Sequence, residues 1–189
     1  MRAFVVLLAA LVVASCAFES DRPLFGPEGA VTPIQDGAVF DWRTSDGEAL
    51  RVRFVRSGNG YQFSDLTRPN EAPMQVQFAP VIETRDDDYI AQVALETSDG
   101  DGYAYAFLWP RGDGRYRVIV QPGAFGAASG EGAQYCTPAA YGACTFTSVE
   151  QIRRYYREVL YPQLASGHMP ARYLDLTPVA DGEGKPRDR

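Results

Sequence analysis

Short segments in which apolar and polar residues alternate dominate the chain after residue 37. Residues 50–54 place leucine, valine and phenylalanine alternately with two arginines, and residues 74–78 alternate in the same way. A period of two puts the apolar side chains on one face of a strand. Gly, Asp and Asn residues separate these segments, as in antiparallel hairpins. The pattern predicts a β-rich domain over residues 37–178.

One stretch of this domain recurs further along the chain. The Thr-Ser-Asp-Gly turn at residues 44–47 reappears at residues 97–100, and the glycine-flanked turn at 58–60 reappears at 112–114. A strand follows each of these turns. The fold class that we predict is therefore mainly β, a duplicated β-meander forming an antiparallel sandwich or a closed barrel. Chance reuse of the same turn residues is the alternative explanation.

A helical pattern follows the second meander, at about residues 148–161. Thr147 or Ser148 can cap its N-terminus, and Pro162 is expected to end or kink it near residue 161. Apolar residues fall on one stripe of this helix. They are Val149, Ile152, Tyr156, Val159 and Leu160.

Four aromatic residues share one face of a predicted strand, and small or aliphatic residues occupy the other face. A strand that is apolar on both faces lies between two layers, or lines a barrel while a helix covers its outside. Core packing is the simpler interpretation. The alternative is a cavity or groove for an apolar ligand, a glycan or a peptide. The four residues are Tyr103, Tyr105, Phe107 and Trp109.

The chain begins with the features of an export signal. Arg2 precedes an apolar run at residues 3–14, which is shorter than the roughly 20 residues that span a bilayer as a helix. The run ends in Val-Ala-Ser-Cys at residues 13–16, which resembles the lipobox of bacterial lipoproteins. The resemblance implies that residues 1–15 are a signal peptide and that Cys16 is the site of lipidation. An ordinary signal peptide, with an incidental cysteine, is the alternative.

The lipoprotein resemblance also implies a location. Cys16 would carry a diacylglyceryl thioether and an N-linked chain such as palmitate, and several chains together hold a protein firmly on a membrane. Ala17, where an aspartate would retain a lipoprotein at the inner membrane, implies sorting to the outer membrane, facing the periplasm. Residues 16–36 contain three prolines and no sustained periodicity, so they are predicted to be a lipidated tether. Within it, Leu24 and Phe25 are expected to dock on the domain.

Length and charge narrow the class of protein. Removal of residues 1–15 leaves 189 − 15 = 174 residues, which suits one domain. The net charge then moves from −6 to −7, because Arg2 is the only charge lost. An acidic chain without a Lys/Arg cluster repels phosphate backbones, so nucleic acid is not an expected partner. Residues 179–189 are predicted to form a disordered tail.

The two cysteines of the domain, Cys136 and Cys144, are predicted to form a disulfide, because exported cysteine pairs meet an oxidising compartment. A redox pair or half of a metal site is the alternative, but the spacing is not that of a C-x-x-C motif. The cysteine-flanked segment that continues through residues 146–151 resembles that of uncharacterised proteobacterial lipoproteins. This resemblance covers about the last third of the domain and implies no activity.

No catalytic, metal or cofactor site emerges from the sequence. His168 is the only histidine, and no G-x-S-x-G nucleophile motif is present. Asp86, Asp87 and Asp88 resemble a solvated turn. We therefore expect a non-enzymatic binding module of the cell envelope, anchored to the membrane by its lipid, whose ligand is an envelope protein, a glycan or an apolar molecule. A hydrolase or transferase of the envelope that uses these three carboxylates is the alternative.

Overall fold

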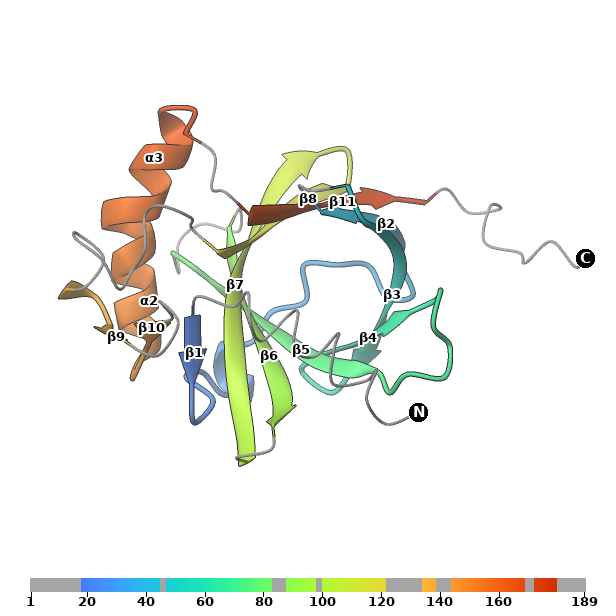
Figure 1. Cartoon of the computed structure of the whole chain (residues 1–189), viewed down its shortest axis with the longest axis horizontal. Helices are drawn as coiled ribbons and strands as arrows, with labels where there is room; N and C mark the ends of the chain where they lie inside the picture. The colour runs from blue at the N-terminus through green and yellow to red at the C-terminus, as the bar shows by residue number, and fades with distance from the viewer. Residues whose placement is uncertain are drawn as a thin grey trace, which may run out of the picture.

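Eight antiparallel strands close into a barrel, and one helix packs against its outer wall in this computed structural model (Figure 1). The structure describes residues 18–44, 47–82, 88–97, 100–121, 134–138, 144–168 and 172–179. The order around the barrel is β6-β5-β4-β3-β2-β11-β8-β7, and pairing of β6 with β7 closes it. The barrel strands are β2 (Val39–Thr44), β3 (Ala49–Ser57), β4 (Gly60–Asp65), β5 (Met74–Pro80), β6 (Tyr89–Thr97), β7 (Gly100–Gly112), β8 (Arg115–Gln121) and β11 (Arg172–Pro178).

The two predicted meanders are present. The pairing of β6 with β7 closes the sheet, so the fold is a barrel and not a sandwich. Strands β2, β3 and β4 pair in succession, as do β6, β7 and β8. The repeated turns therefore occupy equivalent places in two three-stranded units. Strand β5 joins the units on one side, and β11 pairs with both β2 and β8 on the other. The predicted mainly β fold with a C-terminal helix is confirmed.

Aromatic side chains fill the interior of the barrel. The rings of Phe40 and Phe54 lie 5.8 Å apart, edge to face, and those of Tyr61 and Phe78 lie at the same distance. All four are buried. An eight-stranded barrel is just wide enough for side chains to fill it. The interior is a packed core, so a bound ligand has to be sought on the outside.

The N-terminal residues 18–36, called the strap below, lie against the barrel, so the expected tether is wrong for these residues. Strand β1 (Phe18–Ser20) pairs with β7, and the 3-10 turn η1 (Pro27–Gly29) follows. Phe25 packs into the core under the helix, with Leu24 beside it, as expected. Ile34 enters the barrel core, where the Tyr61 hydroxyl donates to its carbonyl. Burial of such side chains offsets the entropy cost of ordering the strap.

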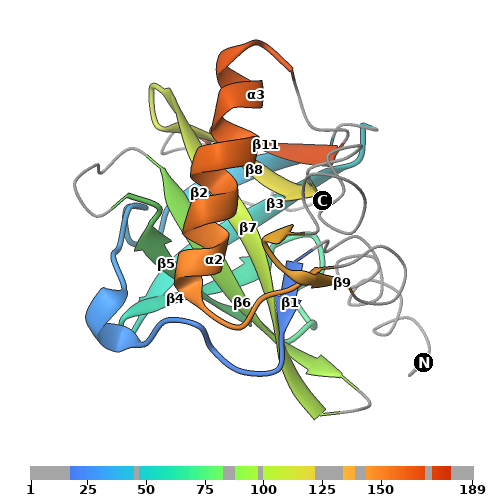
Figure 2. The same cartoon turned by 90° about the vertical axis from the view of Figure 1, so that its left-hand side faces the viewer.

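The helix has three consecutive parts, which lie across the outside of the barrel (Figure 2). They are α2 (Val149–Tyr155), the π-helical turn η5 (Tyr156–Leu160) and α3 (Tyr161–Ala165). The Ser148 hydroxyl caps the N-terminus by accepting from Gln151 N at 3.3 Å.

Pro162 does not end the helix, contrary to the predicted end at about residue 161. It occupies the first turn of α3, and the Tyr161 amide just before it donates to Tyr156 O, five residues back. A proline ring clashes with the carbonyl four residues earlier in a regular α-helix. The wider π turn accommodates Pro162, and the helix continues to Ala165.

A disulfide joins Cys136 to Cys144 beside the helix, as predicted. Strand β10 (Cys144–Thr145) pairs with both β1 and β9 (Thr137–Pro138), so the bridge lies next to the strap. Among the described residues, no helix is both long and apolar enough to cross a bilayer. The predicted signal peptide, Cys16, and residues 180–189 of the predicted tail lie outside the described residues.

Candidate functional site

The aromatic stripe of β7 belongs to the core between barrel and helix. Tyr105 and Phe107 are 1% and 2% exposed, and the Phe107 ring lies 5.0 Å from that of Tyr156 on the helix. Tyr103 and Trp109, at the two ends of the stripe, are half-buried against the same cluster. Tyr105 and Phe107 are thus enclosed in this cluster, Phe107 by the helix and Tyr105 by residues 22–25 and Gln92. The interpretation as core packing is confirmed for these two residues.

The acidic run supplies one described carboxylate, Asp88, which is buried. The Tyr156 hydroxyl donates to Asp88 Oδ2 at 2.6 Å. This contact fastens the helix to the start of β6, which is a structural role. Asp86 and Asp87 lie outside the described residues. Nowhere in the described ranges do three histidine, cysteine or acidic side chains gather in a way that could hold a metal ion.

A polar network on the outer wall holds the strap. Gln92 Oε1 accepts from Leu24 N at 2.8 Å and from the Tyr105 hydroxyl at 3.1 Å. Gln92 Nε2 donates to Phe25 O and to Gln77 Oε1, at 3.3 and 3.1 Å. Burial raises the pKa of Tyr105, so its hydroxyl stays protonated within this network.

Arginine side chains gather on the outside of the barrel, over β3, β2, β11, β8 and the β7–β8 turn. We call this surface the arginine wall. Strand pairing places Arg43 opposite Asp175, which is also opposite Arg117 on the next strand. One strand over, Asp41 pairs with Arg51. The arginines of the wall are Arg43, Arg51, Arg53, Arg111, Arg115 and Arg117, and its acids are Asp41, Asp113 and Asp175.

Each acid of the wall is already paired with one arginine. Asp41 binds Arg51 through two hydrogen bonds, of 2.7 and 3.2 Å. Asp175 binds Arg117 likewise, at 2.6 and 2.9 Å, and this pairing raises the pKa of the Arg117 guanidinium further. Asp113 accepts from Arg115 at 3.3 Å. Six arginines against three acids leave a local charge of 6 − 3 = +3 in an acidic chain.

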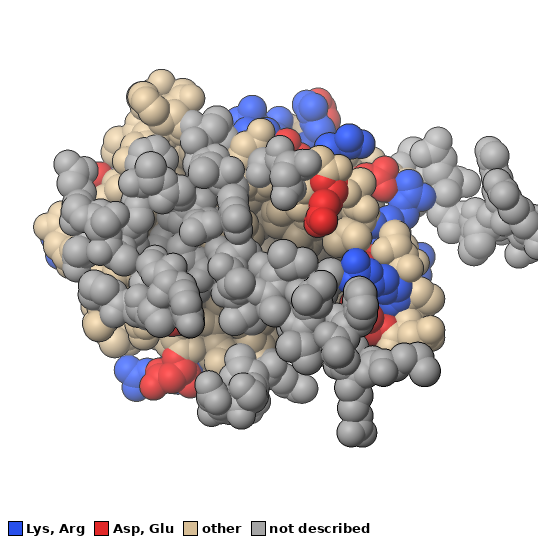
Figure 3. Space-filling view, viewed as in Figure 1, with Lys and Arg blue, Asp and Glu red and all other residues tan. Residues whose placement is uncertain are grey.

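Three arginines of the wall, Arg43, Arg53 and Arg111, are exposed and form no ion pair with any described residue. Arg43 also lines a hollow of about 280 Å³ between β2 and β3, which Arg51 and Trp42 border. Figure 3 shows the cationic side chains along the top and right of the molecule, over β8, β11, β2 and β3. Unpaired guanidinium groups offer forked donors to carboxylates or phosphates.

Two guanidinium groups of the wall also lie over aromatic rings. Arg111 lies over the Trp109 ring at 4.8 Å from its centroid, and Arg117 over the Tyr173 ring at 4.2 Å. Such stacking restricts the side chains and lowers the entropy lost when they bind a partner. The wall thus combines fixed and unpaired cations on a rigid sheet.

Sequence reasoning missed the arginine wall. The alternation of arginines with apolar residues at 50–54 indicated that they face outward. It did not indicate that Arg117 and Arg43 would flank the same aspartate, because this depends on how β11 pairs with two strands from different parts of the chain.

No protein-family model matches the chain, and the comparisons with curated proteins and with solved structures gave no significant match.

Proposed function

We propose that this protein is a non-enzymatic binding module of the bacterial cell envelope, anchored by lipid at Cys16 and facing the periplasm from the outer membrane. Its arginine wall binds the acidic surface of an envelope protein. The lipobox-like residues 13–16 support the anchor. The observation that carries the binding role is the set of exposed arginines without an ion pair among the described residues, Arg43, Arg53 and Arg111, on a wall with excess positive charge.

The composition of the wall favours a protein partner over a small molecule. Arg, Trp and Tyr are the residue types that most often dominate binding energy in protein interfaces. In the wall, Trp109 on β7 and Tyr173 on β11 lie on the two strands that flank β8. The packed barrel interior leaves the outer surface for recognition. Complementary charge would also speed association with an acidic partner at low salt.

Site-specific photo-crosslinking in intact cells tests this proposal. A crosslinking residue at position 55, next to the wall, is expected to capture an envelope protein, and one at position 161 on the helix is not. Val55 and Tyr161 are comparably exposed, at 43% each. Capture should be lost in Arg43→Glu/Arg53→Glu and retained in Arg154→Glu/Arg157→Glu, which changes the net charge by the same amount on the helix.

Three outcomes would each contradict a different part of the proposal. Equal capture by wild type and Arg43→Glu/Arg53→Glu would show that the wall is not the binding surface. Binding of the purified protein to vesicles of anionic phospholipid, lost in the same double variant, would make a lipid head group the partner in place of a protein. The lipid anchor would be overturned if the Cys16→Ala variant still pelleted with membranes and wild type incorporated no labelled fatty acid.

A further inference from the structure

A second hollow, separate from the arginine wall, lies on the outer side of β4, β5, β6 and the first half of β7. Its volume is about 270 Å³. Among the described residues, no charged side chain lines it. The side chains around it are those of Ser57, Gln75, Gln77, Gln92, Ala94 and Tyr103.

The orientation of the Gln92 amide is fixed by its neighbours. The backbone amides of Leu24 and Phe25 both point at Gln92 Oε1, at 2.8 and 3.4 Å. A backbone N–H can only donate, so the atom it meets must be the carbonyl oxygen of the glutamine. The Gln92 Nε2 group therefore faces Gln77.

This arrangement orients Gln77 in turn. Gln92 Nε2 donates to Gln77 Oε1 at 3.1 Å, which leaves the Gln77 Nε2 group as the free end of that amide. No described residue accepts a hydrogen bond from it. The strap thus holds, through Gln92, a hydrogen-bond donor in a set orientation at the wall of the hollow.

The backbone fixes the shape of the hollow. A Cβ atom added to Gly60 would meet Val76 O at 2.4 Å, so only glycine allows β4 to approach β5 this closely. Ala94 on β6 lies opposite Tyr103 on β7 and keeps the side next to the tyrosine open. The hollow is a feature of rigid strands and does not depend on a loop.

We propose that this hollow binds a neutral sugar ring of a glycan. A sugar hydroxyl both donates and accepts, and the amides of Gln75 and Gln77 offer both donors and an acceptor. Tyr103 supplies an aromatic ring at the border, which suits the apolar face of a pyranose. The described lining residues carry no charge, which disfavours phosphorylated or acidic sugars, and the small volume suits one ring. This inference does not rest on the arginine wall.

Nuclear magnetic resonance titration of the purified, ¹⁵N-labelled protein tests the site. The probes are two neutral trisaccharides, maltotriose and tri-N-acetylchitotriose. At least one of them should produce saturable shifts of the Gln77 side-chain NH₂ signals and of the Ala94 backbone amide. Binding should be weak, with a dissociation constant in the millimolar range, because the hollow is shallow.

Two variants and one control locate the binding. Ala94→Trp places a large side chain in the hollow and should abolish the shifts. Gln77→Ala removes one neutral hydrogen bond and should weaken binding about fivefold. Gln62→Ala, also on the outer wall but outside the hollow, should bind as wild type does. Thermal melting confirms that each variant is folded.

Absence of any shift with both sugars at millimolar concentration would overturn the proposal. Shifts that persist unchanged in Ala94→Trp would overturn it as well, because they would place the sugar elsewhere. Neither result bears on the arginine wall, because protein binding there is tested separately by the Arg43→Glu/Arg53→Glu variant.

Discussion

The hydroxyl of Tyr156 donates a 2.6 Å hydrogen bond to Asp88 Oδ2, and the two residues are 1% and 8% exposed. The contact joins the π turn of the helix to the chain just before β6. A buried carboxylate needs such donors, because its desolvation is costly. The helix is therefore held to the barrel by a polar contact within an otherwise apolar interface.

Tyr156→Phe removes this donor and keeps the ring. We expect the free energy of unfolding to fall by about 1–3 kcal/mol, since a hydrogen bond to a charged, buried acceptor is lost. Urea denaturation followed by circular dichroism measures it. Tyr161→Phe, at a tyrosine that is 43% exposed, is the matched control and should change stability by less than about 0.5 kcal/mol. Equal stability of the two variants would mean that Asp88 does not need this partner.

Gln92→Leu should release the strap. The Phe25 amide loses its acceptor, and the Leu24 amide keeps only the Tyr105 hydroxyl, at 3.2 Å. A buried amide without a partner costs about 1–3 kcal/mol. Hydrogen exchange at these two amides should accelerate more than exchange in β3. Gln62→Leu on the neighbouring wall serves as the control. Unchanged exchange at Phe25 would show that Gln92 does not hold this part of the strap.

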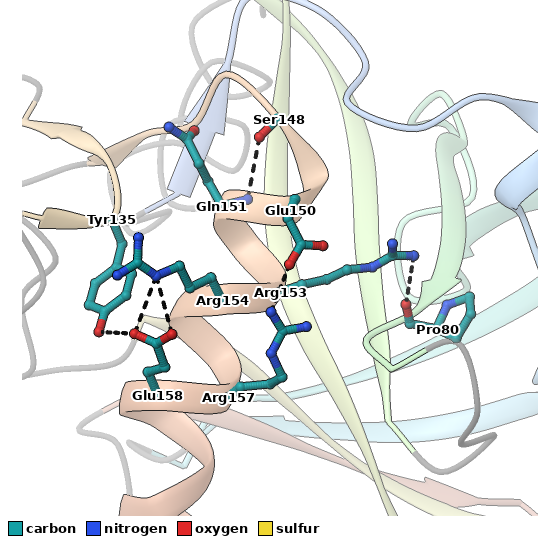
Figure 4. A network of polar contacts seen from close by, with 9 residues as sticks. All are labelled: Pro80, Tyr135, Ser148, Glu150, Gln151, Arg153, Arg154, Arg157 and Glu158. Atoms are coloured by element: carbon teal, nitrogen blue, oxygen red, sulfur yellow. Dashed lines mark hydrogen bonds and ion pairs between the residues drawn. The ribbon is translucent and has the colours of Figure 1, made fainter.

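The helix surface predicts a pH dependence through Glu158. The Tyr135 hydroxyl and then Arg154 lower the pKa of Glu158 from its usual 4.5, and Figure 4 shows both converging on this carboxylate. A lowered folded-state pKa gives a stabilisation that is present above the unfolded-state value. It is lost as the pH falls through the folded-state pKa.

Glu158→Gln should therefore lower the melting temperature at neutral pH, and the difference from wild type should shrink as the pH falls from the unfolded-state pKa of 4.5 through the lower folded-state pKa. Melting curves at a series of pH values measure this. Glu28→Gln, which removes a carboxylate from η1, controls for the change in net charge. A difference that stays constant with pH would contradict the coupling.

Reduction of the disulfide should destabilise the domain. The bridge joins buried cysteines that are eight residues apart, and closure of such a loop is worth about 2.5 kcal/mol on the chain-entropy model. Cys136→Ser/Cys144→Ser should unfold at lower urea concentration than the oxidised wild type. Reduced wild type should match the double variant. If reductant leaves the wild-type midpoint unchanged, the bridge does not stabilise the domain.

Local patterns were enough to predict the strands, the paired meanders, the helix and the disulfide. Alternation and turn residues act over a few positions, and the capping residue Ser148 and the apolar stripe define the helix start directly. The helix end was wrong because Pro162 fits a π turn, and nothing in the residue types distinguishes that turn from a break.

Features that depend on distant pairing could not be predicted. Closure of the barrel requires β11 to lie between β2 and β8, and the strap requires Gln92 to meet amides about 67 residues earlier in the chain. The prolines of residues 16–36 indicated a spacer, yet Ile34 and Phe25 bury enough apolar surface to dock it. The candidate sites are equally non-local, since both gather side chains from several strands.

The pairing of β1 with β7 has a consequence for how far the domain can move from its anchor. Strand β1 begins at Phe18, two residues after Cys16, and two residues extend at most about 7 Å. With lipid on Cys16, as proposed, the barrel could lie only a few ångströms from the membrane surface and would rest beside the bilayer. A protein partner would then have to bring its acidic surface to the membrane, because the barrel could not reach out across the periplasm to meet it.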